Sequence, residues 1–252
     1  MSLDLNGKII MVTGATRGLG RALTKSLVEN GCKVYAVGRN EELLKSLKEE
    51  CTNVTTIQVD VGNWEDVRQK LENIEVLDGL VNNAAVVGQD FMPVVDVTEE
   101  ILDKNLNVNV KSTINITQII GRKMVENKRP GSIVNVSSVW SIQATKGYFP
   151  YCISKAAVDM VTKQFALELG PHNIRVNSFN PTVFLSDTIK GMIERGIDLK
   201  GMFHKITPLS KIAEVEEMVF PILYLLSDKS AMVSGTTHIA DGAMISSFPS
   251  GM

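Results

Sequence analysis

The chain has 252 residues, a length that suits one large α/β domain, and its 26 Lys and Arg nearly balance its 28 Asp and Glu. This balance gives no bulk attraction to nucleic acid or to an anionic membrane. The three cysteines are odd in number and scattered, a usage typical of reduced thiols. The longest apolar stretch, Val219 to Leu226, is too short to cross a bilayer, and the histidines lack acidic partners. We therefore expect a cytoplasmic protein with no secretory leader, transmembrane segment or metal site.

Apolar runs rich in β-branched residues alternate along the chain with segments of helical periodicity, such as Arg21 to Glu29 and Leu43 to Glu50. The predicted strands are Lys8–Thr13, Lys33–Val37, Thr55–Val59, Gly79–Val81, Ser132–Val136, Arg175–Phe179 and Thr237–Ala240. Strands this apolar are buried on both faces. The alternation predicts an α/β fold: a doubly wound (Rossmann) parallel sheet of about seven strands, in a single domain spanning residues 1–252.

The first predicted strand leads into a glycine-rich turn, Thr13-Gly14-Ala15-Thr16-Arg17-Gly18-Leu19-Gly20. A strand before the turn and a helix after it are the context of a dinucleotide-binding fingerprint. Gly14 would allow the sharp turn, Gly18 the approach of a pyrophosphate, and Gly20 close packing of helix on sheet. The helix N-terminus would present unpaired N–H groups to the phosphates. Tight turns without a ligand also produce this pattern, so the turn alone is a weak signal.

The end of the second predicted strand bears on the choice of dinucleotide. An NAD enzyme usually places an acid there, but this chain has Val37-Gly38-Arg39-Asn40, with no acid before Glu41. Arg39, and Arg17 in the glycine-rich turn, both suit a 2′-phosphate, because a planar guanidinium binds two oxygens at once. Either arginine alone is more often a solvated side chain. The pair, in the absence of the acid, favours NADP(H).

A Tyr and a Lys stand four residues apart in Tyr151-Cys152-Ile153-Ser154-Lys155, with Ser138 thirteen residues upstream of Tyr151. Positions i and i+4 share one face of a helix, so the Lys155 ammonium is expected to lower the pKa of the Tyr151 phenol. Such a phenol could transfer protons in a hydride-transfer reaction. By itself this spacing is common on solvated helices.

Taken together, these motifs resemble the short-chain dehydrogenase/reductase family, whose active site is a Ser, a Tyr, a Lys four residues on, and an Asn. The resemblance covers nearly all of the chain. The segments Asn82-Asn83-Ala84-Ala85, Asn180-Pro181-Thr182-Val183 and Ala166 to Asn177 are most similar to L-xylulose/dicarbonyl reductases and related tetrameric carbonyl reductases. The resemblance implies a homotetrameric, NADPH-dependent carbonyl reductase that transfers a hydride to a ketose or α-dicarbonyl, a small-molecule substrate.

The resemblance also implies a catalytic role for each of four residues. Tyr151 would donate the proton, Ser138 would hydrogen-bond the substrate carbonyl, and Lys155 would lower the Tyr151 pKa and hold the nicotinamide ribose. Asn109 would position a water that reloads the proton through Lys155. The adjacent Ser137 is set aside by the interval of thirteen, and the choice of Asn109 over Asn107 rests on the resemblance alone.

The remaining site residues follow from the same likeness. The cofactor site would comprise Gly14, Thr16, Arg17, Gly18, Leu19, Gly20, Arg39, Asp60, Val61, Asn82, Asn83, Ala84, Tyr151, Lys155, Pro181, Val183 and Ser186. The substrate pocket would be lined by Ser138, Val139, Trp140, Thr145, Tyr148 and Tyr151. Asp60 could instead cap its strand, and Trp140 and Tyr148 could be core or interface aromatics. Thr182, Ala85 and Ala243 stand where many members have Gly, which leaves the backbone at Thr182 uncertain.

The segment from Thr182 to Ile212 has no clear strand and is interrupted by Gly191, Gly196 and Gly201. A tolerant surface insertion and a mobile lid over the substrate both fit this composition, and the resemblance favours the lid. Two alternative functions remain open. One is a reductase or dehydrogenase of steroid or acyl-chain ketones, which share the scaffold. The other is a non-catalytic NADP(H)-binding sensor, although such proteins normally lose a catalytic residue.

Overall fold

A computed structural model describes residues 3–87 and 91–246 of the chain. Seven parallel strands form one sheet in the order β3-β2-β1-β4-β5-β6-β7. The strands are β1 (Ile9–Thr13), β2 (Lys33–Gly38), β3 (Val54–Gln58), β4 (Gly79–Asn82), β5 (Gly131–Val136), β6 (Ile174–Pro181) and β7 (Thr237–Ala240). The strand order reverses between β1 and β4, where a doubly wound sheet binds its ligands. The predicted doubly wound parallel sheet is confirmed.

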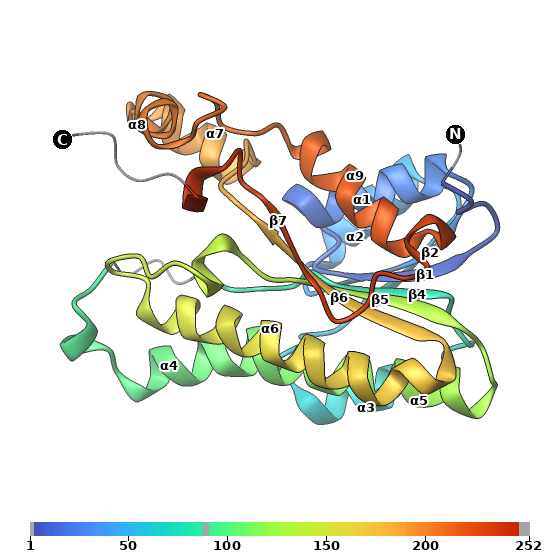
Figure 1. Cartoon of the computed structure of the whole chain (residues 1–252). Coiled ribbons are helices and arrows are strands. Elements are labelled where there is room, and N and C mark those ends of the chain that lie inside the picture. Colours follow the sequence, from blue (N-terminus) through green and yellow to red (C-terminus); the bar gives the residue numbers. More distant parts are fainter. Residues whose placement is uncertain (1–2, 88–90, 247–252) are drawn as a thin grey trace.

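Helices cover both faces of the sheet (Figure 1). One layer comprises α1 (Gly18–Glu29), α2 (Glu41–Glu50) and α9 (Val215–Leu226). The other comprises α3 (Trp64–Leu71), α4 (Glu99–Asn105), α5 (Ser112–Glu126) and α6 (Phe149–Leu169). Successive residues of a strand point to opposite faces, so Ile10 and Val12 pack in the core under α1 while Met11 packs in the core under α5. This explains why the strands are apolar without alternation.

A π-helical turn, η2 (Leu106–Lys111), separates α4 from α5. Such turns are rare and occur often at functional sites. The described residues also form five short 3₁₀ turns: η1 (Val94–Asp96), η3 (Val139–Ser141), η4 (Gly170–His172), η5 (Asp228–Ser230) and η6 (Met244–Ser246). Within the described ranges no helix has the length and apolar character needed to span a bilayer. Nor do His, Cys, Asp and Glu side chains of these residues gather in a group that could hold a metal ion.

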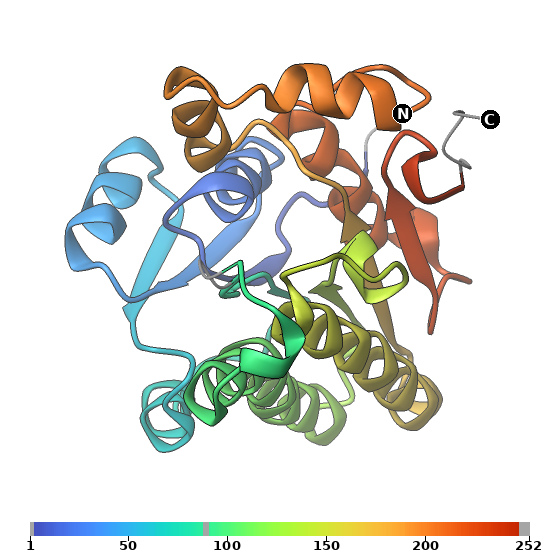
Figure 2. The ribbon, with the colours of Figure 1, turned by 90° about the vertical axis from the view of Figure 1, so that its left-hand side faces the viewer.

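The segment after β6 forms two short helices, α7 (Asp187–Glu194) and α8 (Leu199–Ile206), beyond the carboxyl edge of the sheet (Figure 2). Its two ends are joined by a parallel bridge between Phe184 and Ala213. Phe203 is the one buried side chain of these two helices. The segment is therefore held at its two ends, and its two helices bury few side chains.

Candidate active site

The glycine-rich turn has the shape that its sequence predicts. Gly14 has a φ of 64°, and a Cβ atom on it would lie 2.9 Å from the Ala84 Cα atom. A Cβ atom on Gly20 would lie 2.2 Å from the Gly14 carbonyl oxygen, so only glycine lets α1 pack this closely. Gly18 differs, because its Cβ atom would meet nothing nearer than the Ser186 side chain at 3.8 Å. The turn therefore leaves open space beside Gly18.

The N-terminus of α1 lacks the side-chain cap that neighbouring helices have. The helices α2, α3 and α4 are capped by Asn40, Asn63 and Thr98, and each carries two acidic residues in its first turn. Arg17 precedes α1 without capping it, and the first turn of α1 holds no acid. Its N–H groups and the positive end of its dipole thus suit an anion. A dinucleotide pyrophosphate fits this site.

Asn83, which directly follows β4, contacts the glycine-rich turn. Its side-chain amide donates to the carbonyl oxygens of Thr13 (2.9 Å) and Gly14 (3.2 Å). The Thr13 hydroxyl accepts from the N–H groups of Asn83 and Ala84, both at 3.0 Å. These contacts hold the end of β4 against the glycine-rich turn.

Asn82, by contrast, points into the interior. Its amide donates to Thr117 Oγ1 (2.9 Å) and to Asn135 Oδ1 (2.8 Å), and all three side chains are buried. In this structure Asn82 crosslinks β4 to α5 and β5 rather than contacting the glycine-rich turn.

Arg17 and Arg39 are both exposed. The residues that precede them in the chain, Thr16 and Gly38, are neighbours in space, because a Cβ atom on Gly38 would lie 2.6 Å from the Thr16 methyl group. The Arg39 guanidinium lies 3.5 Å from Asp60, whose other carboxylate oxygen accepts from a backbone N–H. Such an exposed pair contributes little to stability, so Arg39 can be redirected to a phosphate. Val61, next to Asp60, is buried in the core.

The structure brings Ser138 to Tyr151. Ser138 follows β5 and caps η3, and its side chain is close enough to the Tyr151 hydroxyl near the start of α6 to lower the pKa of that phenol. The neighbouring Ser137 hydroxyl instead donates to the backbone carbonyl of Lys155 (3.1 Å). The two serines are therefore distinguished by their contacts, and Ser138 is the one that faces the phenol.

The expected lowering of the Tyr151 pKa is not found in this structure. Burial raises the pKa of Tyr151 to about 12, although its hydrogen bond with Ser138 acts in the opposite direction. Lys155 Nζ donates to the Val136 carbonyl (2.7 Å) and lies 5.5 Å from the Tyr151 ring centre. Burial also lowers the pKa of Lys155 to about 8, opposed by the carboxylate of Asp159. Burial thus has the largest effect on both pKa values.

Asn109 lies in the π-helical turn and is buried, whereas Asn107 is partly exposed. The Asn109 amide donates to the Val86 carbonyl and to Ser154 Oγ, each at 2.9 Å, and its oxygen accepts from the Val86 N–H at 2.8 Å. Asn109 therefore links the segment after β4 to α6, next to Lys155. Its side-chain groups all contact protein atoms, and the water-positioning role stays a prediction.

Aromatic rings form a wall beside Tyr151. The ring centres of Trp140 and Tyr148 are 4.5 Å apart, and those of Trp140 and Tyr151 are 5.9 Å apart. Phe91 extends this wall, edge-on to Tyr148 at 6.0 Å. Sequence reasoning missed Phe91, because only the fold brings the segment after β4 against residues 147–148.

The other predicted pocket residues are placed less directly. Val139 is buried, and Thr145 is partly exposed and accepts the Tyr148 N–H through its carbonyl at 3.3 Å. Val139 therefore supports the aromatic wall rather than offering its own surface.

The strand end at Pro181 accommodates Thr182 without strain. Thr182 is not among the residues with positive φ, its N–H donates to Ala240 O (3.1 Å), and its hydroxyl contacts Met244 Sδ (3.6 Å). Ala243, in contrast, has a φ of 68°, a conformation that favours glycine. The partly exposed Val183 and Ser186 follow Thr182, and Ser186 caps α7 opposite Gly18.

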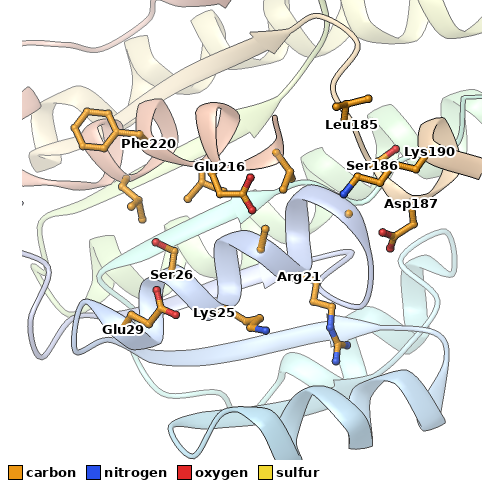
Figure 3. A pocket seen from close by; sticks show the side chains of 15 residues that line it. Arg21, Lys25, Ser26, Glu29, Leu185, Ser186, Asp187, Lys190, Glu216 and Phe220 are labelled. Carbon is orange, nitrogen blue, oxygen red and sulfur yellow. The ribbon is translucent and has the colours of Figure 1, made fainter. Parts of the chain in front are cut away.

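A cavity of about 470 Å³ adjoins the glycine-rich turn on its outer side. It runs between α1, the start of α7 and α9, and its labelled side chains include Arg21, Ser186, Glu216 and Phe220 (Figure 3). None of Asn109, Ser138, Tyr151 or Lys155 lines it. This cavity is therefore separate from the catalytic candidates.

Comparison with known proteins agrees with this geometry. The family model for short chain dehydrogenases matches residues 8–195. L-xylulose reductase of Homo sapiens is 42% identical over 242 residues, which are 96% of this chain and 98% of the relative. Carbonyl reductase (NADPH) 2 of Sus scrofa is 41% identical over 247 residues, 98% of this chain and 100% of the relative. The predicted likeness to these reductases is confirmed.

A solved structure of a gluconate 5-dehydrogenase from Burkholderia cenocepacia J2315 in complex with NADP and tartrate has a similar fold. It is 26% identical, its TM-score is 0.89, and the match covers 98% of each chain. The sheet order, the glycine-rich turn, the Ser138–Tyr151 contact and these relatives lead to one assignment. The chain belongs to the short-chain dehydrogenase/reductase family of oxidoreductases.

Proposed function

We propose that this protein is an NADPH-dependent carbonyl reductase that acts on a small α-dicarbonyl or ketose. The observation that carries the proposal is the convergence of Ser138, Tyr151 and Lys155 at the carboxyl edge of the sheet. The segment after β4 connects this group to the glycine-rich turn. In this segment the Asn83 amide contacts the Gly14 carbonyl, and the Val86 N–H contacts Asn109. The identity above 40% to L-xylulose reductase and carbonyl reductase (NADPH) 2 supports the substrate class.

NADPH is the cofactor that the site residues suit. The uncapped end of α1 and the open space at Gly18 accommodate a pyrophosphate, and Arg17 and Arg39 suit a 2′-phosphate. When bound, the reduced nicotinamide supplies the hydride. Pro181, Val183 and Ser186 would hold its amide end.

The chain's own residues supply the proton and stabilise the developing charge. The Ser138 hydroxyl would hydrogen-bond the substrate oxygen, and the Tyr151 phenol would donate a proton to it. The raised pKa of Tyr151 keeps the phenol protonated at neutral pH, as a proton donor requires. The Lys155 ammonium would stabilise the phenolate that remains after transfer.

A screen of NADPH consumption tests the function and its alternatives together. We expect diacetyl and L-xylulose to be reduced with a kcat/KM well above that for a ketosteroid or an acetoacetyl thioester. Faster reduction of the steroid or the thioester would instead support the alternative ketone reductases, which share this fold. Tight NADPH binding without turnover of any compound would support a sensor.

We also propose a homotetramer assembled through the helices that begin near Ile101 and Tyr151. Met160 and Leu167 support it, because they stand seven residues apart on α6 with 61% and 73% of their surface exposed. Replacing both by Glu should reduce the mass measured by light scattering, whereas Lys48→Glu on α2 should not. A monomeric unmodified protein would contradict the tetramer. A cytoplasmic location likewise stays a prediction.

Residues 182–212 are proposed as a lid over the substrate. The segment buries only Phe203 in its two helices, and its ends are held together by the Phe184–Ala213 bridge. A segment with few buried contacts and a fixed base can open locally while the sheet stays folded.

A further inference from the structure

A polar cluster behind Ser138 joins three separate elements. Asp159 lies on α6, two turns beyond Tyr151, while Ser141 ends η3 and Asn180 lies near the end of β6. The Asp159 carboxylate accepts from Ser141 Oγ (2.5 Å) and from Asn180 Nδ2 (3.0 Å). Both donors also contact the Ser138 carbonyl, at 2.7 Å and 3.0 Å.

The number of available protons decides which of these contacts are hydrogen bonds. The Ser141 hydroxyl has a single proton and two acceptors within reach. The carboxylate of Asp159 is charged and closer, so it is the stronger acceptor. The Asn180 amide has two protons and three acceptors within reach: Ser141 Oγ (2.8 Å), the Ser138 carbonyl (3.0 Å) and the charged Asp159 carboxylate (3.0 Å). Ionised Asp159 thus directs both donors.

The orientation of Asn180 depends on Asp159. Asn180 is completely buried, and its side-chain oxygen has no hydrogen-bond partner within the described part of the chain. Turning the amide around would place that oxygen against the Asp159 carboxylate and the Ser138 carbonyl, where acceptors repel one another. The carboxylate therefore keeps the Asn180 N–H groups directed at Ser138.

We infer that Asp159 is a positioning residue: through Ser141 and Asn180 it holds the Ser138 backbone, and with it the hydroxyl that contacts Tyr151. The cluster ties the turn that carries Ser138 to the helix that carries Tyr151 and Lys155. The inference rests on the proposed function, since the placement of Ser138 affects turnover only if Ser138 binds the substrate oxygen.

Steady-state kinetics with diacetyl test the inference through the variant Asp159→Asn, which keeps the side-chain shape and removes the charge. We expect kcat to fall about tenfold, because small misplacements of reacting groups slow the reaction strongly, while the Kd for NADPH changes less than about twofold. Glu168→Gln on the same helix, an exposed residue bonded to Gln164, is the control and should leave both values unchanged. An unchanged kcat in Asp159→Asn, or an equal loss of NADPH affinity, would overturn the inference.

Ser141→Ala provides a second route to the same contact. If Asp159 acts through Ser141 and Asn180, the double variant should lose about as much turnover as the worse single variant. Effects that multiply would mean that the two residues act separately, against the inference. Should Asp159→Asn fail to fold, Ser141→Ala carries the kinetic measurement, and an unchanged kcat there counts against it.

Hydrogen exchange separates failure of this inference from failure of the proposed function. The Ser141 N–H donates to the Ser138 carbonyl (3.0 Å), and it should exchange faster in Asp159→Asn, or in Ser141→Ala, than in Glu168→Gln. This measurement needs no turnover, so it decides the positioning role even if the unmodified protein reduces none of the carbonyls. Equal exchange rates would show that Asp159 does not hold the turn.

Discussion

The two halves of the sheet build their sites in different ways. In the half formed by β1 and β2, the parts that suit the cofactor's pyrophosphate and 2′-phosphate come from one short stretch of chain, from the glycine-rich turn to Arg39. In the half formed by β4, β5 and β6, the catalytic candidates come from distant segments; Asn109 and its partner Ser154 are 45 residues apart. The first site presents backbone N–H groups and exposed arginines, and the second presents buried side chains held by hydrogen bonds.

This difference has a functional consequence. Affinity for the cofactor should depend on the helix end and the arginines, while turnover should depend on side chains that the cofactor half does not contain. Substitutions of the two arginines and of the Tyr151 hydroxyl are therefore expected to affect one property and spare the other.

The largest expected effect is on turnover, from Tyr151→Phe. This change removes the proton donor and keeps the ring against Trp140, so kcat should fall by roughly 10²–10⁴-fold, the usual contribution of general acid catalysis. NADPH affinity, measured by fluorescence titration, should stay nearly unchanged. A variant with near-native kcat would show that the proton comes from another group.

Replacing Arg17 and Arg39 together by Ser tests the cofactor half. Hydrogen bonds to charged groups contribute about 1.5–3 kcal/mol each, and about 1.4 kcal/mol is a tenfold change in affinity. We expect the ratio of kcat/KM for NADPH over NADH to fall by one or more orders of magnitude while kcat with saturating NADPH is retained. The exposed Arg122→Ser on α5 is the control. Equal kcat/KM for the two cofactors in the unmodified protein would contradict the selection of NADPH.

The pH dependence of turnover distinguishes the two halves without a substitution. Because burial lowers the pKa of Lys155 to about 8, kcat for reduction should decline above this pH as the ammonium loses its proton. Arginine does not titrate in this range, so NADPH binding through Arg17 and Arg39 should persist. Turnover that stays constant to about pH 10, two units above this pKa, would exclude a required Lys155 charge.

The decline should not arise from unfolding. Between about pH 8 and the ordinary lysine value of 10.5, the unfolded chain holds more protons at Lys155 than the folded chain does. This group therefore adds stability as the pH rises through that window. Melting curves recorded beside the kinetics will separate the two effects.

The smallest effects concern the proposed lid, residues 182–212. Gly191 lies within α7 with open space around it, so Gly191→Ala should stabilise that helix by about 1 kcal/mol. Gly196 has a φ of 87°, and the same substitution there should cost about 1–2 kcal/mol. If the segment closes over substrate, the two variants should change kcat and KM a few-fold in different directions.

Hydrogen exchange tests separately whether residues 187–206 close over the substrate. Amides of residues 187–206 should be protected more by substrate with NADPH than by NADPH alone. Protection that is already complete without ligand would show a rigid wall. Gly201 does not serve as a hinge test, because a Cβ atom there would lie 2.2 Å from the Asp198 carboxylate that caps α8.

Much of the fold follows from local patterns in the sequence. Apolar β-branched runs predict all seven strands to within a few residues, because strands buried on both faces are mostly apolar. The glycine-rich turn is local in part, since Gly14 needs its positive φ and Gly20 lies against the Gly14 carbonyl oxygen, whereas the contact of Gly14 with Ala84 requires the fold. The Tyr151–Lys155 spacing also predicts the helix that carries both candidate residues, α6.

Other properties depend on contacts between distant segments, which spacing does not encode. Burial by the packed strands raises the Tyr151 pKa and lowers the Lys155 pKa. The shift at Tyr151 is opposite to the one that the Tyr–Lys spacing predicts. The assignments of Asn82 to the interior, Phe91 to the aromatic wall and Asp159 to the cluster behind Ser138 also require the fold. The sequence alone determined the strands and the positive-φ glycine of the turn, and its likeness to a family gave the candidate reacting side chains. The tertiary structure decided their desolvation and their hydrogen-bond partners, because both depend on which distant groups exclude water.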